Sequence, residues 1–413
     1  MNILLVSFYN PLGKGGFEKQ TIGFLKELAN QDNRIGCITF AKSDEKSTIH
    51  SSLVKSGLFR LGIYVLDFRE DSHSLKAKLM FWLAINSSNF LSKYYSNLGQ
   101  SIAFTIKKIR SQSSIDFIHI HGLKTAYIFP DCQENSFLID LLDSFSLCEK
   151  RSLSYCLKKD RKHAFFSYIN YLKILKIEKS LLKKYAKKCP FVMISEYDAK
   201  YLQSKSPKAR IYTIAAATDK LDLISEESRL NKPEKKLVFC GFMNRLHNYD
   251  AFIWLVEAIM PLVVRAHPET KLEVTGFAIP KQFYQMQDHF RWLKVMPEVE
   301  DINSFMSQAT LICWPFRYGA GIKTKILESM ALGKAIVSTK IGVEAFTSSQ
   351  TRGILIANTA ESLADCINQL LANSKYRENM GRINLEIINS EFSWEKRAER
   401  YLQLYHNNIA TES

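Results

Sequence analysis

Residues 318–339 read YGAGIKTKILESMALGKAIVST, a glycine-rich turn followed by an amphipathic helix, a glycine stop and a buried strand. Gly319 and Gly321 allow the backbone of the turn to approach a ligand closely, and Gly333 stands where a helix C′ residue belongs. A predicted strand, Leu311–Trp314, comes before the turn. The order strand, helix, strand is typical of a parallel α/β sheet.

The start of this helix has the properties of an anion site. Free N–H groups at a helix N-terminus suit a phosphate or diphosphate, and Lys323 and Lys325 add two cations where the helix dipole disfavours them. Lys325 and Glu328 are three residues apart and share a helix face. One bound molecule could place its phosphate on Lys325 and a hydroxyl on Glu328. The same spacing also fits an ion pair on a surface helix.

The same alternation runs through the rest of the chain. Strands are predicted at 3–8, 35–40, 63–68, 117–121, 137–142, 191–194, 237–240, 271–275, 292–295 and 335–339. Helical periods separate them, including an amphipathic helix over Asp250–Arg265. Residues 221–236 have no apolar period and are interpreted as a linker. We therefore expect two doubly wound α/β domains, 1–228 and 229–393, that face each other across a cleft, with a C-terminal helix within 394–413 that packs back on the first.

Length and composition fit this arrangement and limit the function classes. The 413 residues are 46% hydrophobic and 23% charged, which is too apolar for a disordered or fibrous chain. The eight cysteines are scattered without a Cys-x-x-Cys pair, so a zinc ribbon or disulfide framework has no support and a reducing cytosol is favoured. The opening residues MNILLVSF suit a buried strand, and we expect no targeting segment.

The net charge of +15 comes from 56 Lys and Arg against 41 Asp and Glu, and much of the excess is local. Between Lys150 and Lys188, thirteen basic residues stand against two acidic ones, with aromatic residues between them. The segment is either a solvated helix face or a surface that docks on anionic lipid headgroups, at about 1 kcal/mol per well-placed cation. Binding to nucleic acid ranks third among the interpretations, because no zinc-finger or RNP signature accompanies the charge.

Two further segments lie at or just after the carboxyl ends of predicted strands, where open parallel sheets bind ligands. In DFIHIHG, residues 116–122, strand alternation puts His119 and His121 on one face, with His121 at the strand exit. A lone strand-end histidine is usually structural, and a metal site would need a third ligand that no recognisable spacing supplies. Residues 13–16, GKGG, form a glycine turn in which Lys14 is either a phosphate contact or a solvated loop lysine.

Taken together, these motifs resemble the retaining glycosyltransferases of family 4, which have the GT-B fold. Residues 319–339 are similar to the donor-site signature of that family, and the resemblance covers almost the whole chain. Shorter similar segments lie in both predicted domains, at 140–146, 195–196, 241–244, 248–251, 272–276, 342–344 and 392–395. As a set they are specific.

The resemblance implies transfer of a sugar from a nucleotide diphosphate sugar with retention at the anomeric carbon. Glu328 would bind the donor ribose hydroxyls, and Val299 would read the nucleobase through its backbone. The diphosphate would lie against a continuous run of backbone: Ala320, Gly321, Ile322, Lys323, Thr324 and Lys325. In the first domain, Gly15 and Gly16 would face the donor phosphate and the acceptor, and His121 would lie beside the transferred sugar with His119 packed beneath it.

Three positions that are charged in the commoner family pattern hold other residues here: Phe242, His247 and Ala320. The candidates to compensate the diphosphate charge in their place are Lys323, Lys325, Arg245 and a protonated His247. We expect catalysis to depend on His121, Lys325 and Glu328. Without an Asp-x-Asp motif, we expect neither a metal nor any resident cofactor besides the donor substrate.

The leading hypothesis is a cytoplasmic, metal-independent glycosyltransferase of surface polysaccharide or glycolipid biosynthesis. Its partners would be a nucleotide-sugar donor, a glycan or lipid-linked acceptor and, through residues 150–188, the inner face of the plasma membrane; nucleic acid is not expected. Two alternatives keep the GT-B fold. One is a nucleotide-sugar epimerase, and the other is a catalytically altered polyanion-binding or scaffold protein.

Overall fold

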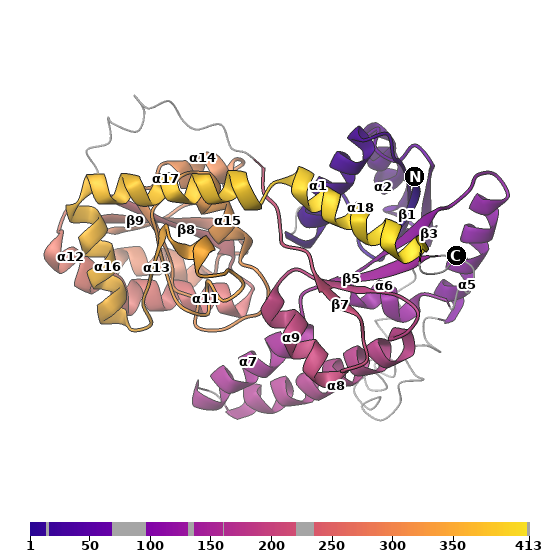
Figure 1. Cartoon of the computed structure of the whole chain (residues 1–413). Helices are drawn as coiled ribbons and strands as arrows, with labels where there is room; N and C mark the ends of the chain where they lie inside the picture. The colour runs from indigo at the N-terminus through magenta and orange to yellow at the C-terminus, as the bar shows by residue number, and fades with distance from the viewer. Residues whose placement is uncertain (14–15, 68–95, 131–135, 160, 220–234, 411–413) are drawn as a thin grey trace. The chain divides into compact units, whose positions relative to one another are not determined.

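The computed structural model describes residues 1–13, 16–67, 96–130, 136–159, 161–219 and 235–410. The chain divides into two compact units (Figure 1). Unit 1 comprises Met1–Ala217 together with Trp394–Ser413, and unit 2 comprises Thr218–Ser393. The domain boundary expected between 228 and 229 lies outside the described residues, as does most of the predicted linker. No helix in the described ranges is both long and apolar enough to span a bilayer.

Unit 1 is built on a seven-stranded parallel sheet in the order β3-β2-β1-β4-β5-β6-β7. The strands are β1 (Asn2–Ser7), β2 (Arg34–Ala41), β3 (Gly62–Asp67), β4 (Phe117–His121), β5 (Phe137–Leu142), β6 (Phe191–Met193) and β7 (Ile211–Thr213). The helices are α1 (Gly16–Asn30), α2 (Lys46–Lys55), α5 (Ser96–Arg110), α6 (Leu123–Ile128), α7 (Phe145–Lys159), α8 (Arg161–Tyr185), α9 (Glu196–Lys205) and α18 (Trp394–Ala410). The strand order reverses between β1 and β4, which makes their carboxyl ends a switch point where ligands bind in open sheets.

The central strands of unit 1 are mostly apolar because helices cover both faces of the sheet, with His119, His121 and Asp140 as buried polar side chains of β4 and β5. Along β1, Leu4 and Val6 belong to one buried cluster, while Ile3 and Leu5 belong to the other. The first cluster includes residues of α5, α8 and α9, and the second includes residues of α1 and α18. This alternation fixes which strand residues face which layer.

The last helix of the chain, α18, is part of the core of unit 1 and lies along α1 (Figure 1). Tyr401 and Tyr405 are completely buried, and the Tyr401 ring stacks on Phe24 of α1 at 4.3 Å between centroids. A Cβ at Gly23 would lie 2.5 Å from the Trp394 ring, so only glycine permits this approach of the two helices. The C-terminal segment therefore completes the first unit.

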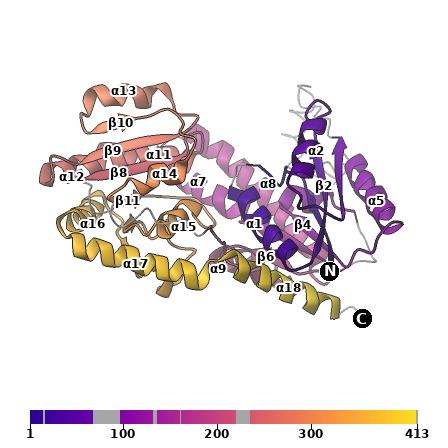
Figure 2. The ribbon, with the colours of Figure 1, turned by 90° about the horizontal axis from the view of Figure 1, so that it is seen from above.

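Unit 2 is a six-stranded parallel sheet in the order β10-β9-β8-β11-β12-β13, and Figure 2 shows β10, β9, β8 and β11 in this order. The strands are β8 (Lys236–Phe242), β9 (Lys271–Phe277), β10 (Leu293–Val295), β11 (Leu311–Trp314), β12 (Ile336–Ser338) and β13 (Ile354–Ile356). The helices are α11 (Leu246–Trp254), α12 (Met260–Ala266), α13 (Lys281–His289), α14 (Ile302–Ser307), α15 (Thr324–Ala331), α16 (Ala360–Ala372) and α17 (Ser374–Glu391), with a 3-10 turn at Ser349–Thr351. Here the switch point lies between β8 and β11.

The single helix predicted over Asp250–Arg265 is wrong in detail. The segment consists of α11, a π-helical turn at Leu255–Ile259, and α12 with Pro261 in its first turn. Proline has no N–H to donate and its ring collides with the carbonyl four residues earlier, so an α-helix cannot pass through it unchanged. The wider π turn accommodates the proline and keeps Val256 and Ile259 buried.

Candidate functional site

The turn before α15 owes its shape to two glycines and a buried lysine. Gly319 has φ +126° and Gly321 has φ +68°, backbone conformations that favour glycine. Lys323 is only 8% exposed, and its Nζ donates a hydrogen bond to the carbonyl of Ala320 over 2.6 Å. Lys323 therefore holds the turn in place and brings a positive charge to the buried side of it, next to Ile322.

Helix α15 begins at Thr324, directly after the buried Lys323. Lys325 Nζ donates to Glu328 Oε2 over 2.5 Å, and both side chains are mostly buried. Burial alone would lower the pKa of Lys325, but the influence of Cys240 and Glu328 outweighs it and the pKa is raised. The ion pair that the sequence allowed as an alternative is thus present. The amides of the first turn have no acceptor within the helix.

Arg245 and His247 follow β8, the strand beside β11 in the sheet. Arg245 is exposed, while His247 is half-buried with its ring 6.1 Å from that of Phe316. Burial, with the charges of Lys323 and Arg245, lowers the pKa of His247 to about 4. Near pH 7 the imidazole of His247 is therefore neutral in this structure, and its protonation beside a bound diphosphate stays a prediction.

The carboxyl ends of β8 and β11 bring most of the predicted donor residues of unit 2 to one edge. Arg245 and His247 come from one strand end, and the turn with the α15 start comes from the other. Val299 is apart from them. It follows β10, the edge strand, which is separated from β8 by β9. Within unit 2 the predicted diphosphate-binding residues thus lie at one edge of the sheet, and Val299 lies two strands away from β8.

One contact of this edge escaped prediction from the sequence. Arg317 binds the buried Asp250 of α11 with both Nε, at 2.8 Å, and Nη2. Its guanidinium also lies 4.8 Å from the centre of the Trp254 ring. This contact fixes the start of the turn against α11. Asp250 and Arg317 are 67 residues apart, and no local spacing connects them.

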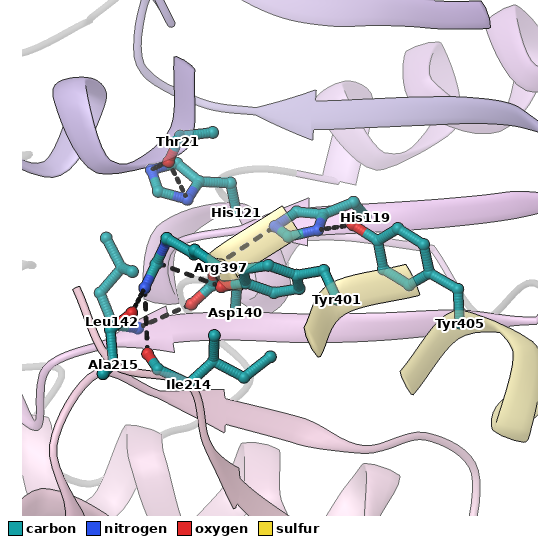
Figure 3. A network of polar contacts seen from close by, with 10 residues as sticks. All are labelled: Thr21, His119, His121, Asp140, Leu142, Ile214, Ala215, Arg397, Tyr401 and Tyr405. Atoms are coloured by element: carbon teal, nitrogen blue, oxygen red, sulfur yellow. Dashed lines mark hydrogen bonds and ion pairs between the residues drawn. The ribbon is translucent and has the colours of Figure 1, made fainter. Parts of the chain in front are cut away.

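In unit 1, His121 ends β4 at the switch point and is 2% exposed. Thr21 Oγ1, from α1, lies 3.0 Å from Nδ1 and 3.1 Å from Nε2 of His121 (Figure 3). Burial lowers the pKa of His121 to about 4, with smaller influences from Asp140, His119 and Arg397. His121 is therefore neutral near pH 7. Gly16 is the exposed first residue of α1, whereas Gly15 lies outside the described residues together with Lys14.

His119 and Asp140 lie at the centre of a buried polar network that α18 closes (Figure 3). Tyr405 Oη is 2.8 Å from His119 Nδ1, and His119 Nε2 is 3.4 Å from Asp140 Oδ2. Tyr401 donates its hydroxyl proton to the same carboxylate oxygen. Burial would raise the pKa of Asp140, but His119, His121 and Arg397 together bring it below its ordinary value. The carboxylate is therefore ionised and fully enclosed.

The fold brings a third possible metal ligand, Asp140, close to His119 and His121, although no sequence spacing predicted it. Ligand atoms of His119, His121 and Asp140 all lie within 4.8 Å of one another. The chemistry of the set is nevertheless that of a compensated carboxylate, because Asp140 already accepts a hydrogen bond from Tyr401 and lies in the field of Arg397. A cation added there would meet the guanidinium charge without water to screen it. We assign His119 and Asp140 a structural role.

Comparisons with known proteins agree with the geometry of unit 2. Residues 234–373 match the family model described as Glycosyl transferases group 1. An uncharacterized 44.6 kDa protein in the cps region of Klebsiella pneumoniae is 26% identical over 129 residues, which are 30% of this chain and 33% of that protein. An uncharacterized glycosyltransferase of Methanocaldococcus jannaschii is 20% identical over 198 residues, 46% of this chain and 50% of that protein. The chain thus spans a third to a half of the length of these curated relatives.

Solved structures are similar over nearly the whole chain. The alignment with sucrose-phosphate synthase from Thermosynechococcus elongatus covers 99% of each chain, with a TM-score of 0.67 and 17% identity. The chain has the GT-B fold. S. aureus TarM is similar to this GT-B chain over 98% of its length and 99% of that chain, with a TM-score of 0.68 and 14% identity. These similarities show the fold of the whole chain, and the family match covers residues 234–373 of unit 2.

Proposed function

We propose that this GT-B chain transfers a sugar from a nucleoside diphosphate sugar to a hydroxyl of a glycan or lipid-linked acceptor, with retention at the anomeric carbon. The observation that carries the proposal is the turn before α15. There, two glycines in positive-φ conformations, the first-turn amides and Lys325 occupy the carboxyl edge of a sheet at its switch point. The solved complex of S. aureus TarM with UDP supports a donor of this class.

In this proposal Glu328 binds the ribose hydroxyls, so donor binding exchanges its ion pair with Lys325 for two contacts to the ligand. The ammonium then faces the diphosphate. The bond from the anomeric carbon to the phosphate oxygen breaks, and the acceptor oxygen forms its bond on the same face. The acceptor proton passes to the departing phosphate. The contribution of the protein is to stabilise the charge that develops on the diphosphate, for which fixed amides and lysines suffice without a metal.

The proposal assigns His121 to the acceptor side, as a neutral group that positions the transferred sugar. The curated relative from a cps region supports a role in surface polysaccharide synthesis. The proposal places the reaction in the cytosol, where the free cysteines among the described residues stay reduced. Neither a metal nor a resident cofactor takes part in it.

Titration calorimetry with UDP-, GDP-, ADP- and CMP-sugars, followed by mass spectrometry with lipid-linked acceptors, tests the proposal. We expect one donor to bind and its sugar to reach an acceptor. Lys325→Met and Glu328→Gln should each weaken donor binding about 10- to 100-fold, because each removes a charged hydrogen-bond partner of the ligand. His121→Asn should lower turnover and leave donor affinity unchanged.

The matched control is Glu361→Gln, an exposed carboxylate of α16 in the same unit, which should bind the donor like the natural chain. Isomerisation or hydrolysis of the donor without an acceptor would instead favour an epimerase. If no activated sugar binds, a polyanion-binding or scaffold protein with a GT-B fold becomes the better description. If Lys325→Met binds donor normally, Lys325 does not compensate for the residues at 242 and 247.

A further inference from the structure

A groove lined by lysines lies in unit 1, between the C-terminal half of α8 and the turn from α9 to β7. Its volume is about 960 Å³. Eight lysines line it, and among its described lining residues there is no Asp or Glu. Leu172, Leu175 and Pro207 contribute apolar surface to the same groove. The groove therefore combines concentrated positive charge with an apolar floor.

The groove continues a stripe that runs along α8. Residues spaced by three and four share one helix face, and this face carries Phe165, Tyr168, Leu172, Lys176, Lys179 and Lys183. The first three are 58%, 47% and 38% exposed, and the three lysines are exposed as well. Along its length the stripe changes from aromatic and apolar to basic. Two aromatic rings and a leucine that are exposed side by side on one helix form a contiguous apolar patch, and such patches are rare on protein surfaces that face only water.

Buried contacts on the opposite face keep the stripe outward. Glu178 is 1% exposed and accepts a hydrogen bond from the Ser146 backbone N–H over 3.2 Å, which ties α8 to the start of α7. Leu182 and Tyr185 are completely buried, and the Tyr185 hydroxyl donates to the carbonyl of Phe129 over 3.3 Å. The helix cannot rotate without breaking these contacts.

The groove is remote from the proposed acceptor side. Its lysines precede β6 and β7, at the amino ends of these strands, whereas His121 lies at the carboxyl end of β4 in the same parallel sheet. A molecule bound in the groove would therefore touch the opposite edge of the sheet. The groove is a docking surface and not a part of the proposed sugar site.

We propose that the groove and the α8 stripe together dock the protein on a bilayer of anionic phospholipid. Clustered lysines bind anionic headgroups, and exposed aromatic side chains are stable at the boundary between headgroups and acyl chains. Duplex nucleic acid would satisfy the lysines but offers no apolar layer to Phe165 and Leu172. The inference is independent of the proposed sugar transfer.

Vesicle sedimentation with the full-length chain tests the proposal. The chain should partition onto phosphatidylcholine vesicles that contain phosphatidylglycerol, and only weakly onto pure phosphatidylcholine. Replacing four groove lysines together (Lys179→Gln, Lys183→Gln, Lys187→Gln and Lys208→Gln) should weaken partitioning about 600-fold, since each lysine near an anionic surface contributes about a factor of five. A matched control removes four exposed lysines elsewhere: Lys26→Gln, Lys107→Gln, Lys108→Gln and Lys375→Gln. It should partition within about three-fold of the natural chain.

The aromatic half of the stripe is tested at high salt, where lysine contacts are screened. Phe165→Ser with Tyr168→Ser should abolish the partitioning that survives there, while Phe104→Ser, which changes a 72% exposed ring on α5, should not. Equal loss in the two lysine quadruple variants would overturn the proposal, as would tighter binding to a short DNA duplex than to the vesicles. Circular dichroism confirms folding of each variant, so these outcomes do not depend on whether a donor sugar binds.

Discussion

At the scale of single residues, Asp140 shows how neighbouring side chains stabilise a carboxylate that is fully buried. Its carboxylate accepts the Tyr401 hydroxyl and lies 3.4 Å from His119 Nε2. Burial, together with the negative charge of Asp140, holds the pKa of Tyr401 well above its ordinary value, so the phenol remains protonated and donates. Asp140 lies on β5, which pairs with β4. Its hydrogen bond with Tyr401 therefore links α18 to the strand next to the one that carries His121.

Tyr401→Phe removes one hydroxyl group from this network and leaves the ring in place. We expect the free energy of unfolding of unit 1 to fall by about 1–3 kcal/mol, because an enclosed carboxylate loses a donor that no water replaces. Urea denaturation, with hydrogen–deuterium exchange in β4 and β5 to locate the loss, measures it. Tyr212→Phe is the control, since that side chain is 45% exposed and its hydroxyl can reach solvent. A variant as stable as the natural chain would show that the hydroxyl contributes nothing.

At the scale of elements, Glu178 joins α8 to the first turn of α7. Its carboxylate accepts from the Ser146 hydroxyl and backbone N–H, and Ser144 Oγ lies 3.3 Å from Oε2. Burial nevertheless raises the pKa of Glu178 to about 7, since these hydrogen bonds only partly offset the loss of water. The folded chain thus holds a proton that the unfolded chain has released above pH 4.5.

This difference predicts the pH dependence of the helix pair. Because the folded state binds the extra proton, stability from Glu178 is complete below about pH 4.5 and is lost as the pH rises through 7, by about 3 kcal/mol. Glu178→Gln should remove this slope, measured as urea unfolding from pH 5 to 8. The exposed Glu196→Gln should retain it. Parallel profiles for the natural chain and Glu178→Gln would contradict the assignment.

Most elements of both sheets could be predicted from hydrophobic runs, since buried parallel strands are continuously apolar. The three-residue strands β7 and β13 could not, because Ile211–Thr213 and Ile354–Ile356 are short and partly exposed. The glycine turn and the helix at the carboxyl edge of unit 2 were predictable because they are local in sequence. The polar network was not, because Asp140 and Tyr401 are 261 residues apart and no spacing announces their contact.

At the scale of the whole molecule, the first unit depends on the last helix. Phe24 and Phe117 stack on Tyr401 and Tyr405 at 4.3 and 4.4 Å between ring centroids. A chain truncated after Ser393 would lack Tyr401 and Tyr405, and the rings of Phe24 and Phe117 would then be exposed to water. The loss of two buried aromatic contacts, at about 3–5 kcal/mol each, is comparable to the whole stability of a typical domain.

We therefore expect the chain truncated after Ser393 to unfold in unit 1 while unit 2 keeps its protection from hydrogen exchange. Limited proteolysis and hydrogen–deuterium exchange of the two sheets measure this separately. Truncation after Ala410 is the control, because it retains all of α18. Equal protection of β1 and β4 in both truncated chains would show that α18 adds little to the core.

The return of α18 has a consequence for how the protein is made. On the ribosome, Met1–Ala217 emerges long before Tyr401, since the 176 residues of Thr218–Ser393 are translated between them. At about 5–20 residues per second this delay is about 10–35 s. During that time the nascent chain exposes the apolar surface that α18 covers once it has been translated.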